Sequence, residues 1–586
     1  MKTGGRKGAS LIDLVVALGI LMLLFAGIFL VYYSILDATI NVEKRTEATS
    51  ALNKEIEMIR NLPYAQIGTI GGIPAGVLPQ EQNVSVGDDT FSVKTVVRNI
   101  DDPFDGTLGG TPGDTAPADY KLISLEISCP ICVRFVPLQF TTVVSPKGLE
   151  TAGQTGSLFV NVIDALGNPV PGATVQIVNA SVTPSIDLSD LTNMSGTLQL
   201  VGVPTGTQSY AISVSKSGYS SERTYPANAS SNPNPVKPNA TVAVQAITNL
   251  TFGIDRTSEL DVISSDKVCG GVGGMNFNVS SSKLIGLPSV LKFATSGTTN
   301  AQGSKILPNM EWDAYSMGFS NAGWDLAGTI PLSPFVLDPS TTVPFRFVVQ
   351  LAVPDSLLVT VRDAATQSPV PFPTITVSKP GSSDVKTGGH AFMNQLNWGP
   401  TDYSSQDGGL DGASVPGTLA LNMTPSSTYS TTTSWLISNT FDVGGAAATY
   451  YGFGWNGDQP PQAGEGSVKF QFAANNDNAT WNFAGPDGTG STYYAVSSST
   501  LNSDLNGKRY LRFKVFLTTE NENFTPRLDD VWMEFNSVCV PDSQSLFQGL
   551  SLSTYDIQVS APGYITGIST TTLTADRNEI TINLNK

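Results

Sequence analysis

Hydrophobic and polar residues follow two contrasting patterns along this chain. The run from Leu14 to Leu36 contains no charged residue, and about 20 apolar residues are enough for a helix to cross a bilayer. After this run, Ala48, Leu52 and Ile56 recur at helical spacing. The pattern predicts one continuous helix over residues 9–62, half in a membrane and half outside it.

The rest of the chain alternates apolar and polar residues over short segments, which Gly, Pro, Ser, Thr and Asn residues separate. Such alternation predicts β-strands with one buried face, and many short strands joined by turns are typical of β-sandwiches. Because 586 residues exceed what one hydrophobic core usually serves, several domains are expected. The predicted fold class is α+β: a long N-terminal helix, a small antiparallel sheet beside it, and mostly all-β sandwich domains after it.

Charge limits the choice of partners. The formal net charge is −17 and 14% of the residues are charged, which argues against a nucleic-acid partner because nucleic acids select basic surfaces. Lys2, Arg6 and Lys7 precede the apolar run, and basic flanks of a membrane span stay in the cytoplasm. The bulk of the chain is therefore predicted to lie outside the membrane.

Two residues mark the start of the apolar run. Gly8 stands directly before ASLID, and Asp13 in that segment brings a carboxylate to a membrane helix, where it is costly unless paired. Gly8, ASLID and the uninterrupted apolar helix resemble the type IV prepilin family. The resemblance implies that a prepilin peptidase cuts after Gly8 and methylates Ala9, and that Asp13 is the acidic fifth residue of the mature chain. The family usually has Phe and Glu where this chain has Ala9 and Asp13.

Charge pairing gives a physical reason for keeping the carboxylate. After cutting, Ala9 carries a positive amine, and Asp13 of a neighbouring subunit can neutralise it where the dielectric constant is low. The implied partners are other pilin subunits, which assemble through the N-terminal helix, and the membrane before assembly. A simple single-span anchor is the alternative, and it leaves Asp13 unexplained.

A small pilin-like antiparallel sheet is expected over residues 63–147. Within it, Asp101, Asp102 and Asp105 lie among Gly and Pro residues. Clustered carboxylates on a loop suit Ca²⁺, and the resemblance to secretion pseudopilins, some of which bind calcium in this region, points the same way. Asp also favours ordinary turns, so calcium is one candidate ligand and no cofactor is certain.

The chain has four Cys residues in two settings. Cys129 and Cys132 form SCPICV, and zinc would need a second Cys pair or histidines, whereas the only His lies far along the chain. A local disulfide is the better prediction outside the membrane. Cys269 and Cys539 fall in different predicted domains, where either could be a buried free thiol.

One pattern recurs beyond residue 148. A strand runs into Asp, a turn leads to Pro-Val-Pro, and later strands end in Gly-Tyr. This pattern resembles the carboxypeptidase regulatory-like, transthyretin-type β-sandwich, whose name does not import peptidase activity. A weaker match over 252–353 is interpreted as a degenerate copy. The residues that carry the resemblance are Val170-Pro171-Gly172-Ala173, Gly218-Tyr219, Val370-Pro371 and Gly563-Tyr564.

The last copy is split by residues 399–535, which have a strand pattern of their own and resemble a galactose-binding-like jelly roll. Exposed loops tolerate insertion of a whole domain, so the split is physically reasonable. Trp455, Trp481 and Tyr493 are candidate glycan-binding residues, because an aromatic side chain presents a broad apolar face. The alternative is that these rings fill the core of the jelly roll.

The sequence favours a binding protein over an enzyme. A single His, and no Gly-rich phosphate loop before a helix, remove most catalytic schemes. We expect a minor pilin of a type IV pilus-like fibre, a precursor in the cytoplasmic membrane and then a surface protein, whose ectodomain binds a surface glycan or a protein receptor. The alternatives are a pseudopilin of a type II secretion or DNA-uptake system, and a membrane-anchored surface glycosidase.

The predicted domains are a leader (1–8), the transmembrane and assembly helix (9–62), the pilin-like head (63–147), sandwich 1 (149–251), degenerate sandwich 2 (252–353), split sandwich 3 (354–398 with 536–586) and the inserted jelly roll (399–535).

Overall fold

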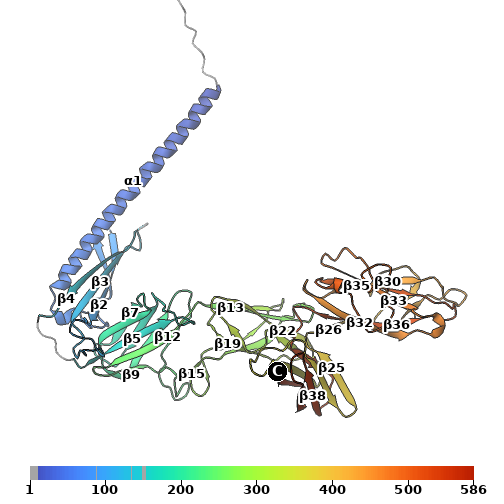
Figure 1. Cartoon of the computed structure of the whole chain (residues 1–586). Coiled ribbons are helices and arrows are strands. Elements are labelled where there is room, and N and C mark those ends of the chain that lie inside the picture. Colours follow the sequence, from blue (N-terminus) through green and yellow to red (C-terminus); the bar gives the residue numbers. More distant parts are fainter. Residues whose placement is uncertain (1–10, 88, 133–134, 148–152) are drawn as a thin grey trace, which may run out of the picture. The chain divides into compact units, whose positions relative to one another are not determined.

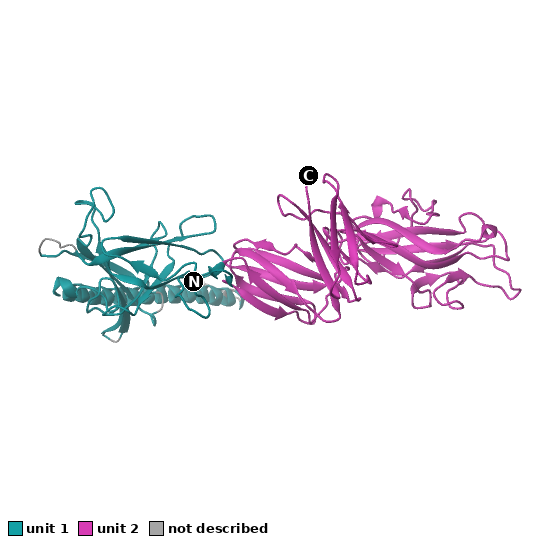
Figure 2. Cartoon of the chain, turned by 90° about the horizontal axis from the view of Figure 1, so that it is seen from below, with its two compact units in different colours: residues 1–256, 284–290 teal, residues 257–283, 291–586 magenta. Residues whose placement is uncertain are grey.

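The computed structural model describes residues 11–87, 89–132, 135–147 and 153–586. The chain forms two compact units, each described here by itself (Figure 2). The first comprises residues 1–256 with 284–290, and the second comprises residues 257–283 with 291–586. One long helix precedes a succession of strands, which confirms the predicted α+β class.

Helix α1 (Leu11–Arg60) is the first element of the first unit (Figure 1). Its part from Leu14 onward is long and apolar enough to cross a membrane, and the most apolar stretch has no buried residue. Near the other end, the side chains of Ala48, Leu52 and Ile59 are 0%, 0% and 1% exposed. The helical spacing of the apolar residues places these three on one face. The predicted division of the helix into an exposed half and a packed half is therefore present.

The packed half of α1 lies against a four-stranded antiparallel sheet in the order β1-β2-β3-β4. Phe91 and Val93 of β2, and Ile123 and Leu125 of β3, form the core with it. The strands are β1 (Glu81–Val86), β2 (Asp89–Ile100), β3 (Tyr120–Ser128) and β4 (Leu138–Val144).

The connection from α1 to this sheet is held by a buried lysine. The Lys121 amine donates to the carbonyl oxygens of Tyr64 at 2.8 Å and Ile67 at 2.5 Å. Burial lowers the pKa of Lys121 to about 8. The Ile67 carbonyl thereby gains a donor, and the Tyr64 carbonyl, which also accepts from the Ile67 amide at 3.2 Å, gains a second one.

Sandwich 1 consists of two sheets of the first unit. One has the order β12-β5-β8, with β12 parallel to β5, and the other contains β6, β7, β9, β10 and β11. The strands are β5 (Thr155–Ile163), β6 (Thr174–Asn179), β7 (Ile186–Leu191), β8 (Thr197–Pro204), β9 (Gly206–Ser215), β10 (Glu222–Arg223), β11 (Ala240–Val242) and β12 (Ile247–Gly253); β15 (Leu284–Gly286) also belongs to this unit.

A paired charge joins the head to sandwich 1. The Arg98 guanidinium donates to both carboxylate oxygens of Asp190, at 2.8 and 2.6 Å. The Asp190 side chain is 7% exposed, and a bidentate pair in such a site has a fixed geometry. Asn99 on the same strand donates to the Val201 carbonyl at 3.0 Å. The head and sandwich 1 are thus in direct, specific contact.

Sandwich 2 opens the second unit. One sheet has the order β18-β13-β22-β20 and the other has the order β17-β14-β19-β21. The strands are β13 (Ser258–Ser265), β14 (Asn276–Ser281), β17 (Ala294–Thr298), β18 (Ser304–Met310), β19 (Asp313–Phe319), β20 (Trp324–Ile330), β21 (Phe335–Leu337) and β22 (Thr342–Leu351).

Sandwich 3 is assembled from two separated parts of the chain. β37 and β40 flank β23 in one sheet, and the other sheet has the order β25-β24-β38-β39. The strands are β23 (Ser356–Asp363), β24 (Thr374–Lys379), β25 (Ser382–Thr387), β37 (Gln544–Phe547), β38 (Thr554–Ser560), β39 (Gly567–Thr572) and β40 (Arg577–Leu584). The interruption lies between β25 and β37.

The insert is a two-layer β-domain. Its strands are β26 (Ala391–Gln395), β27 (Tyr403–Gln406), β28 (Leu410–Asp411), β29 (Leu419–Leu421), β30 (Ser434–Ser438), β31 (Phe441–Asp442), β32 (Thr449–Asp458), β33 (Val468–Asn475), β34 (Ser499–Thr500), β35 (Tyr510–Leu517) and β36 (Arg527–Asn536). β26 pairs with β36 and not with sandwich 3. The insert therefore begins near Ala391, earlier than the expected residue 399, because the pairing partner of a strand decides its domain.

The two copies of the repeated motif use its residues alike. Val170 in sandwich 1 and Val370 in sandwich 3 are 4% and 1% exposed. Gly218 and Gly563 have φ angles of 75° and 81°, a left-handed conformation that favours glycine. The Tyr after each Gly packs against the core of its own sandwich.

Candidate functional site

Gly8 and Ala9, the predicted processing residues, lie outside the described residues. Asp13 lies in the first turns of α1, and its side chain is likewise outside the description. What the structure does show is the apolar surface that follows: large side chains from Leu14 to Leu36 are exposed around the helix. Such a surface requires lipid or other protein chains around it.

Both Cys pairs form disulfides. Cys129 is bonded to Cys132, directly after β3. Cys269 is bonded to Cys539 across a sequence separation of 270, so the expectation that either is a free thiol is wrong. Residues in different domains of the chain meet here because the fold brings the loop after β13 to the segment after β36. Disulfides persist in oxidising surroundings, which together with the apolar helix suggests a membrane-attached, surface-exposed protein.

The acidic segment of the head is electrostatically strained. Burial raises the pKa of Asp101, and the nearby carboxylates of Asp114, Asp119 and Asp105 raise it further. The Leu108 amide donates to the Asp101 carboxylate at 2.9 Å and opposes this increase. One oxygen each of Asp101, Asp114 and Asp119 is buried without a hydrogen-bond partner in the described part of the chain. A cation would satisfy such oxygens.

Asp102 takes a different role from the one predicted for it. One of its carboxylate oxygens accepts a hydrogen bond from the Phe104 amide at 3.1 Å, as in an ordinary Asx turn. Within the described residues, no three His, Cys, Asp or Glu side chains are grouped closely enough to hold a metal ion. The trio Asp101, Asp102 and Asp105 is thus not assembled as one ligand set, and calcium binding stays a prediction that the unpartnered oxygens favour.

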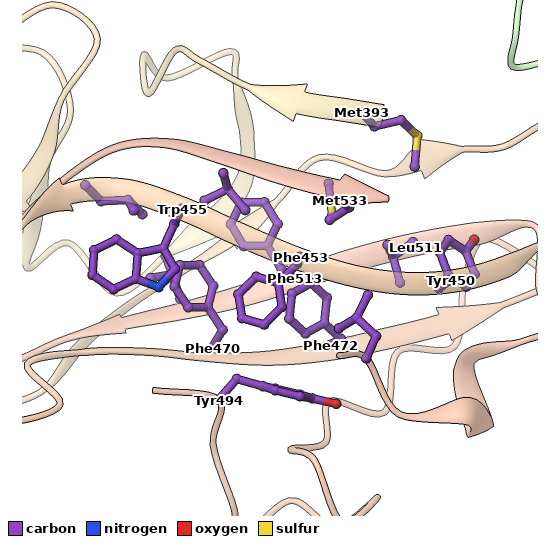
Figure 3. Packing of buried hydrophobic residues seen from close by; sticks show 14 of the residues in the cluster. Met393, Tyr450, Phe453, Trp455, Phe470, Phe472, Tyr494, Leu511, Phe513 and Met533 are labelled. Atoms are coloured by element: carbon purple, nitrogen blue, oxygen red, sulfur yellow. The ribbon is translucent and has the colours of Figure 1, made fainter. Parts of the chain in front are cut away.

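The three aromatic candidates in the insert separate into core and surface. Trp455 is 8% exposed and belongs to the main core cluster, with its ring centroid 6.3 Å from that of Phe470 (Figure 3). It is not available to a ligand, so the prediction of glycan binding was wrong for Trp455 and the core alternative holds. Tyr493 is 41% exposed and Trp481 is partly exposed.

Both surface candidates lie against the outer side of β35. Leu511, Phe513 and Val515 point into the core, because successive side chains of a strand alternate between its faces. The intervening side chains lie on the other side, which we call the β35 face: Tyr510, Arg512, Lys514 and Phe516 of β35 with their flanking side chains Trp435, Lys469, Trp481 and Tyr493.

Aromatic rings and cations are interleaved on the β35 face. The Lys514 amine is 4.2 Å from the centroid of the Trp435 ring and 5.0 Å from that of Phe516. Tyr493 meets Phe516 edge to face, with centroids 5.1 Å apart. These separations are those of cation–π and aromatic pairs.

Two further cations extend the same face. The Arg512 guanidinium lies 4.4 Å from the Trp481 ring and donates to the Thr440 and Ser404 hydroxyl oxygens at 2.8 and 3.0 Å. The Lys469 amine lies 5.9 Å from the Tyr493 ring. Trp435 and Lys469 stand opposite Phe516 on the strands at either side of β35.

The cations of the β35 face have no counterion in the part of the chain that the structure describes: no carboxylate there lies within 4.0 Å of Arg512, Lys514 or Lys469. Burial lowers the pKa of Lys514, and the negative charge of Asp407 partly opposes this decrease. Burial also lowers the pKa of Arg512. Arg512 and Lys514 are thus partly stripped of water; aromatic rings face both, and two hydroxyl groups accept from Arg512.

Sequence reasoning missed Trp435, Lys514 and Phe516. The signal was present in RYLRFKVFL, where every second residue from Tyr510 is aromatic or cationic and the others are apolar. Only the cross-strand neighbours, which come from β30, β33 and a loop, turn that alternation into a surface.

Comparisons with known proteins leave the family open. No family model and no curated protein matches the chain. Among solved structures, the Bacillus anthracis TIE protein aligns at 10% identity over 86% of this chain and 61% of its own, with a TM-score of 0.15. A minor pilin of Streptococcus agalactiae aligns at 12% identity over 34% and 100% (TM-score 0.17), and a streptococcal ancillary pilin at 10% over 74% and 98% (TM-score 0.14). Scores this low carry no argument about fold or function.

Proposed function

We propose that this chain is a minor pilin of a type IV pilus-like surface fibre, assembled through α1 and carrying a binding ectodomain. The observation that carries the proposal is the division of α1. The N-terminal half is apolar and exposed, while the other half packs on a four-stranded antiparallel sheet. A helix of this kind can leave the membrane by exchanging lipid contacts for contacts with other helices, without unfolding its own head.

The sandwich domains and the insert are the binding part of the proposal, and the β35 face is the proposed contact surface. Loops and sheet faces that are not needed for the core can carry recognition residues. We propose no catalytic activity for the chain. Its one His, His390, lies directly before β26, pairs with Glu534 at 2.8 Å and stacks on Tyr451.

Fibre isolation tests the proposal. Sheared surface fibres should contain the chain, and mass spectrometry should find its mature N-terminus at Ala9 and methylated. Gly8→Leu should leave a membrane-bound precursor. Asp13→Ala should be cut and yet enter fibres poorly, while Asp13→Glu should enter them. A mature protein that starts elsewhere, or one found only at the cytoplasmic membrane of a secretion system, would contradict the fibre role.

A further inference from the structure

We propose that the β35 face binds an acidic glycan, a saccharide chain that bears carboxylate or sulfate groups. This inference rests on the proposed function, since it names the ligand of the same ectodomain. Lys514, Arg512 and Lys469 would take the anionic groups, and the rings beside them would take the apolar C–H faces of the sugars.

The charge distribution is the first argument. The chain as a whole carries a net charge of −17, yet this face presents three cations without a carboxylate within ion-pair distance among the described residues. The flanking loop contains Asp477 and Asp487, and both are engaged in their own turns: the Thr480 amide donates to Asp477, and the Thr489 amide to Asp487. Asp407 is the acid that acts on Lys514. These carboxylates lie around the β35 face, whereas the charged side chains on the face itself are cations.

The placement of the rings is the second argument. Tyr493 and Trp481 come from the loop after β33, and Trp435 comes from β30, so aromatic rings stand on both sides of the cations of β35. Successive outward residues of a strand are about 6.6 Å apart, so Arg512, Lys514 and Phe516 form a row. With Tyr510, the outward side chains of β35 run ring, cation, cation, ring, and further rings lie beside them. Such a row suits a linear ligand with spaced charges and apolar faces.

The same chemistry could accept single-stranded nucleic acid, for which aromatic stacking in a basic groove is typical. The acidic character of the chain decides against it. A nucleic-acid strand carries one charge about every 3.4 Å, whereas a glycan with one acid on alternate sugars carries far fewer. Repulsion from a net charge of −17 therefore penalises the nucleic acid more.

The test uses the full-length chain in detergent micelles and three hexasaccharides: hyaluronan, which has carboxylates alone; chondroitin sulfate, which adds sulfates; and neutral chitohexaose. Binding is measured by calorimetry at two salt concentrations. At least one acidic hexasaccharide should bind, more weakly at the higher salt because exposed charges are screened, and chitohexaose should not. Comparison of the two acidic ligands shows which anionic group the face prefers.

The variants locate the site. Lys514→Gln should weaken acidic-glycan binding about tenfold or more, as expected for loss of a charged hydrogen bond, and Trp435→Leu should weaken it as well. Lys305→Gln removes the same charge from an exposed position on sandwich 2 and should change binding less than twofold. If Lys514→Gln alters the thermal melt, Lys469→Gln at the rim of the face replaces it as the test.

Four results would overturn the inference: chitohexaose binding as tightly as the acidic glycans, no acidic-glycan binding, unchanged binding by the Lys514 and Lys469 variants, or tighter binding of a single-stranded oligonucleotide or of anionic phospholipid vesicles. Failure of the fibre role is seen separately, because the chain would then bind glycans and yet be absent from fibres.

Discussion

Sandwich 1 and sandwich 3 are built on one plan, and only the second of them is interrupted. In each, the first strand pairs in parallel with the last, β5 with β12 and β23 with β40. Both also pair an inner strand of the other sheet with the strand that precedes Gly-Tyr, β6 with β9 and β24 with β38. In sandwich 1 the chain passes directly from β7 to β8, whereas in sandwich 3 the whole insert lies between β25 and β37.

This comparison shows at which connection a sandwich tolerates an inserted domain. Ala391 and Phe535 are paired across β26 and β36, so the insert begins and ends at nearly one point. A loop whose two ends stay close costs the host little, because the host strands keep their own partners. Sandwich 3 thus carries a domain with its own core while its strand order remains that of its counterpart.

Removal of the insert should have the largest effect. We expect a chain in which a short Gly-Ser linker replaces residues 391–536 to lose all acidic-glycan binding and to keep sandwich 3 folded, because the paired ends are close. Limited proteolysis of the region 354–390 and calorimetric binding measure the two outcomes. A sandwich 3 that is digested as readily as an unfolded chain would show that the insert is part of its core.

Removal of the disulfide between Cys269 and Cys539 should have the next largest effect, a loss of stability. The disulfide links the loop after β13 to the segment that leads from the insert into sandwich 3. Sandwich 1 has no Cys residue that could form a corresponding disulfide. Replacing both Cys residues by Ala should destabilise the second unit by about 4–5 kcal/mol, since the closed loop is long.

The matched control replaces Cys129 and Cys132 by Ala. That loop is short, so the loss should be about 2 kcal/mol and confined to the head. Urea unfolding followed by domain-specific proteolysis compares the two pairs. Equal losses would mean that the long disulfide does not stabilise by loop closure.

Core truncation tests whether the two sandwiches are equivalent. Leu158 and Leu357 are both 0% exposed and lie at corresponding places in the first strand of each sandwich. Leu→Ala at either position should cost about 3 kcal/mol, within the usual range for a buried leucine. Denaturant midpoints of the two units measure the losses. A much smaller loss at Leu357 would indicate that the interruption has loosened its core.

Removal of the carboxylate in the turn after each first strand should have the smallest effect on stability. The Thr366 amide lowers the pKa of Asp363 to about 2, against the effect of burial, with help from the Tyr564 hydroxyl. A lowered folded-state pKa means that the stabilisation is complete above the unfolded value of about 3.9 and is lost as pH falls towards 2.

The variant Asp363→Asn should therefore lower the melting temperature of the second unit slightly at pH 6, and the difference should shrink as the pH falls to 2. Asp164, whose carboxylate accepts from the Leu166 and Asn168 amides at 2.9 and 2.8 Å, offers the same test in sandwich 1. A difference that persists unchanged at pH 2 would exclude the carboxylate as its cause.

Much of the fold could be predicted because its signals are local. Helical spacing at Ala48 and Leu52 identified the packed half of α1, and both are fully buried. The left-handed glycine before each Tyr of the repeat could be anticipated from the chain alone, because only glycine adopts that conformation without a steric penalty.

The proposed binding surface, the β35 face, could be predicted only in part. Trp481 and Tyr493 were named as candidates and lie at the surface, but Trp455 was named beside them and is buried. Aromatic residues serve cores and contact surfaces equally well, so their identity does not reveal which face of a strand is covered by the opposite layer.

Local signals in the chain were enough to establish the long apolar helix, the strands and the repeated sandwich, because each follows from spacing within a few residues. The tertiary structure alone decided that Cys269 meets Cys539, that β26 belongs to the insert, and that Trp435 stands beside Lys514. Each of these contacts joins residues far apart in the chain. Its existence depends on which sheets pack together, and the balance of all burial and pairing in the fold sets that packing.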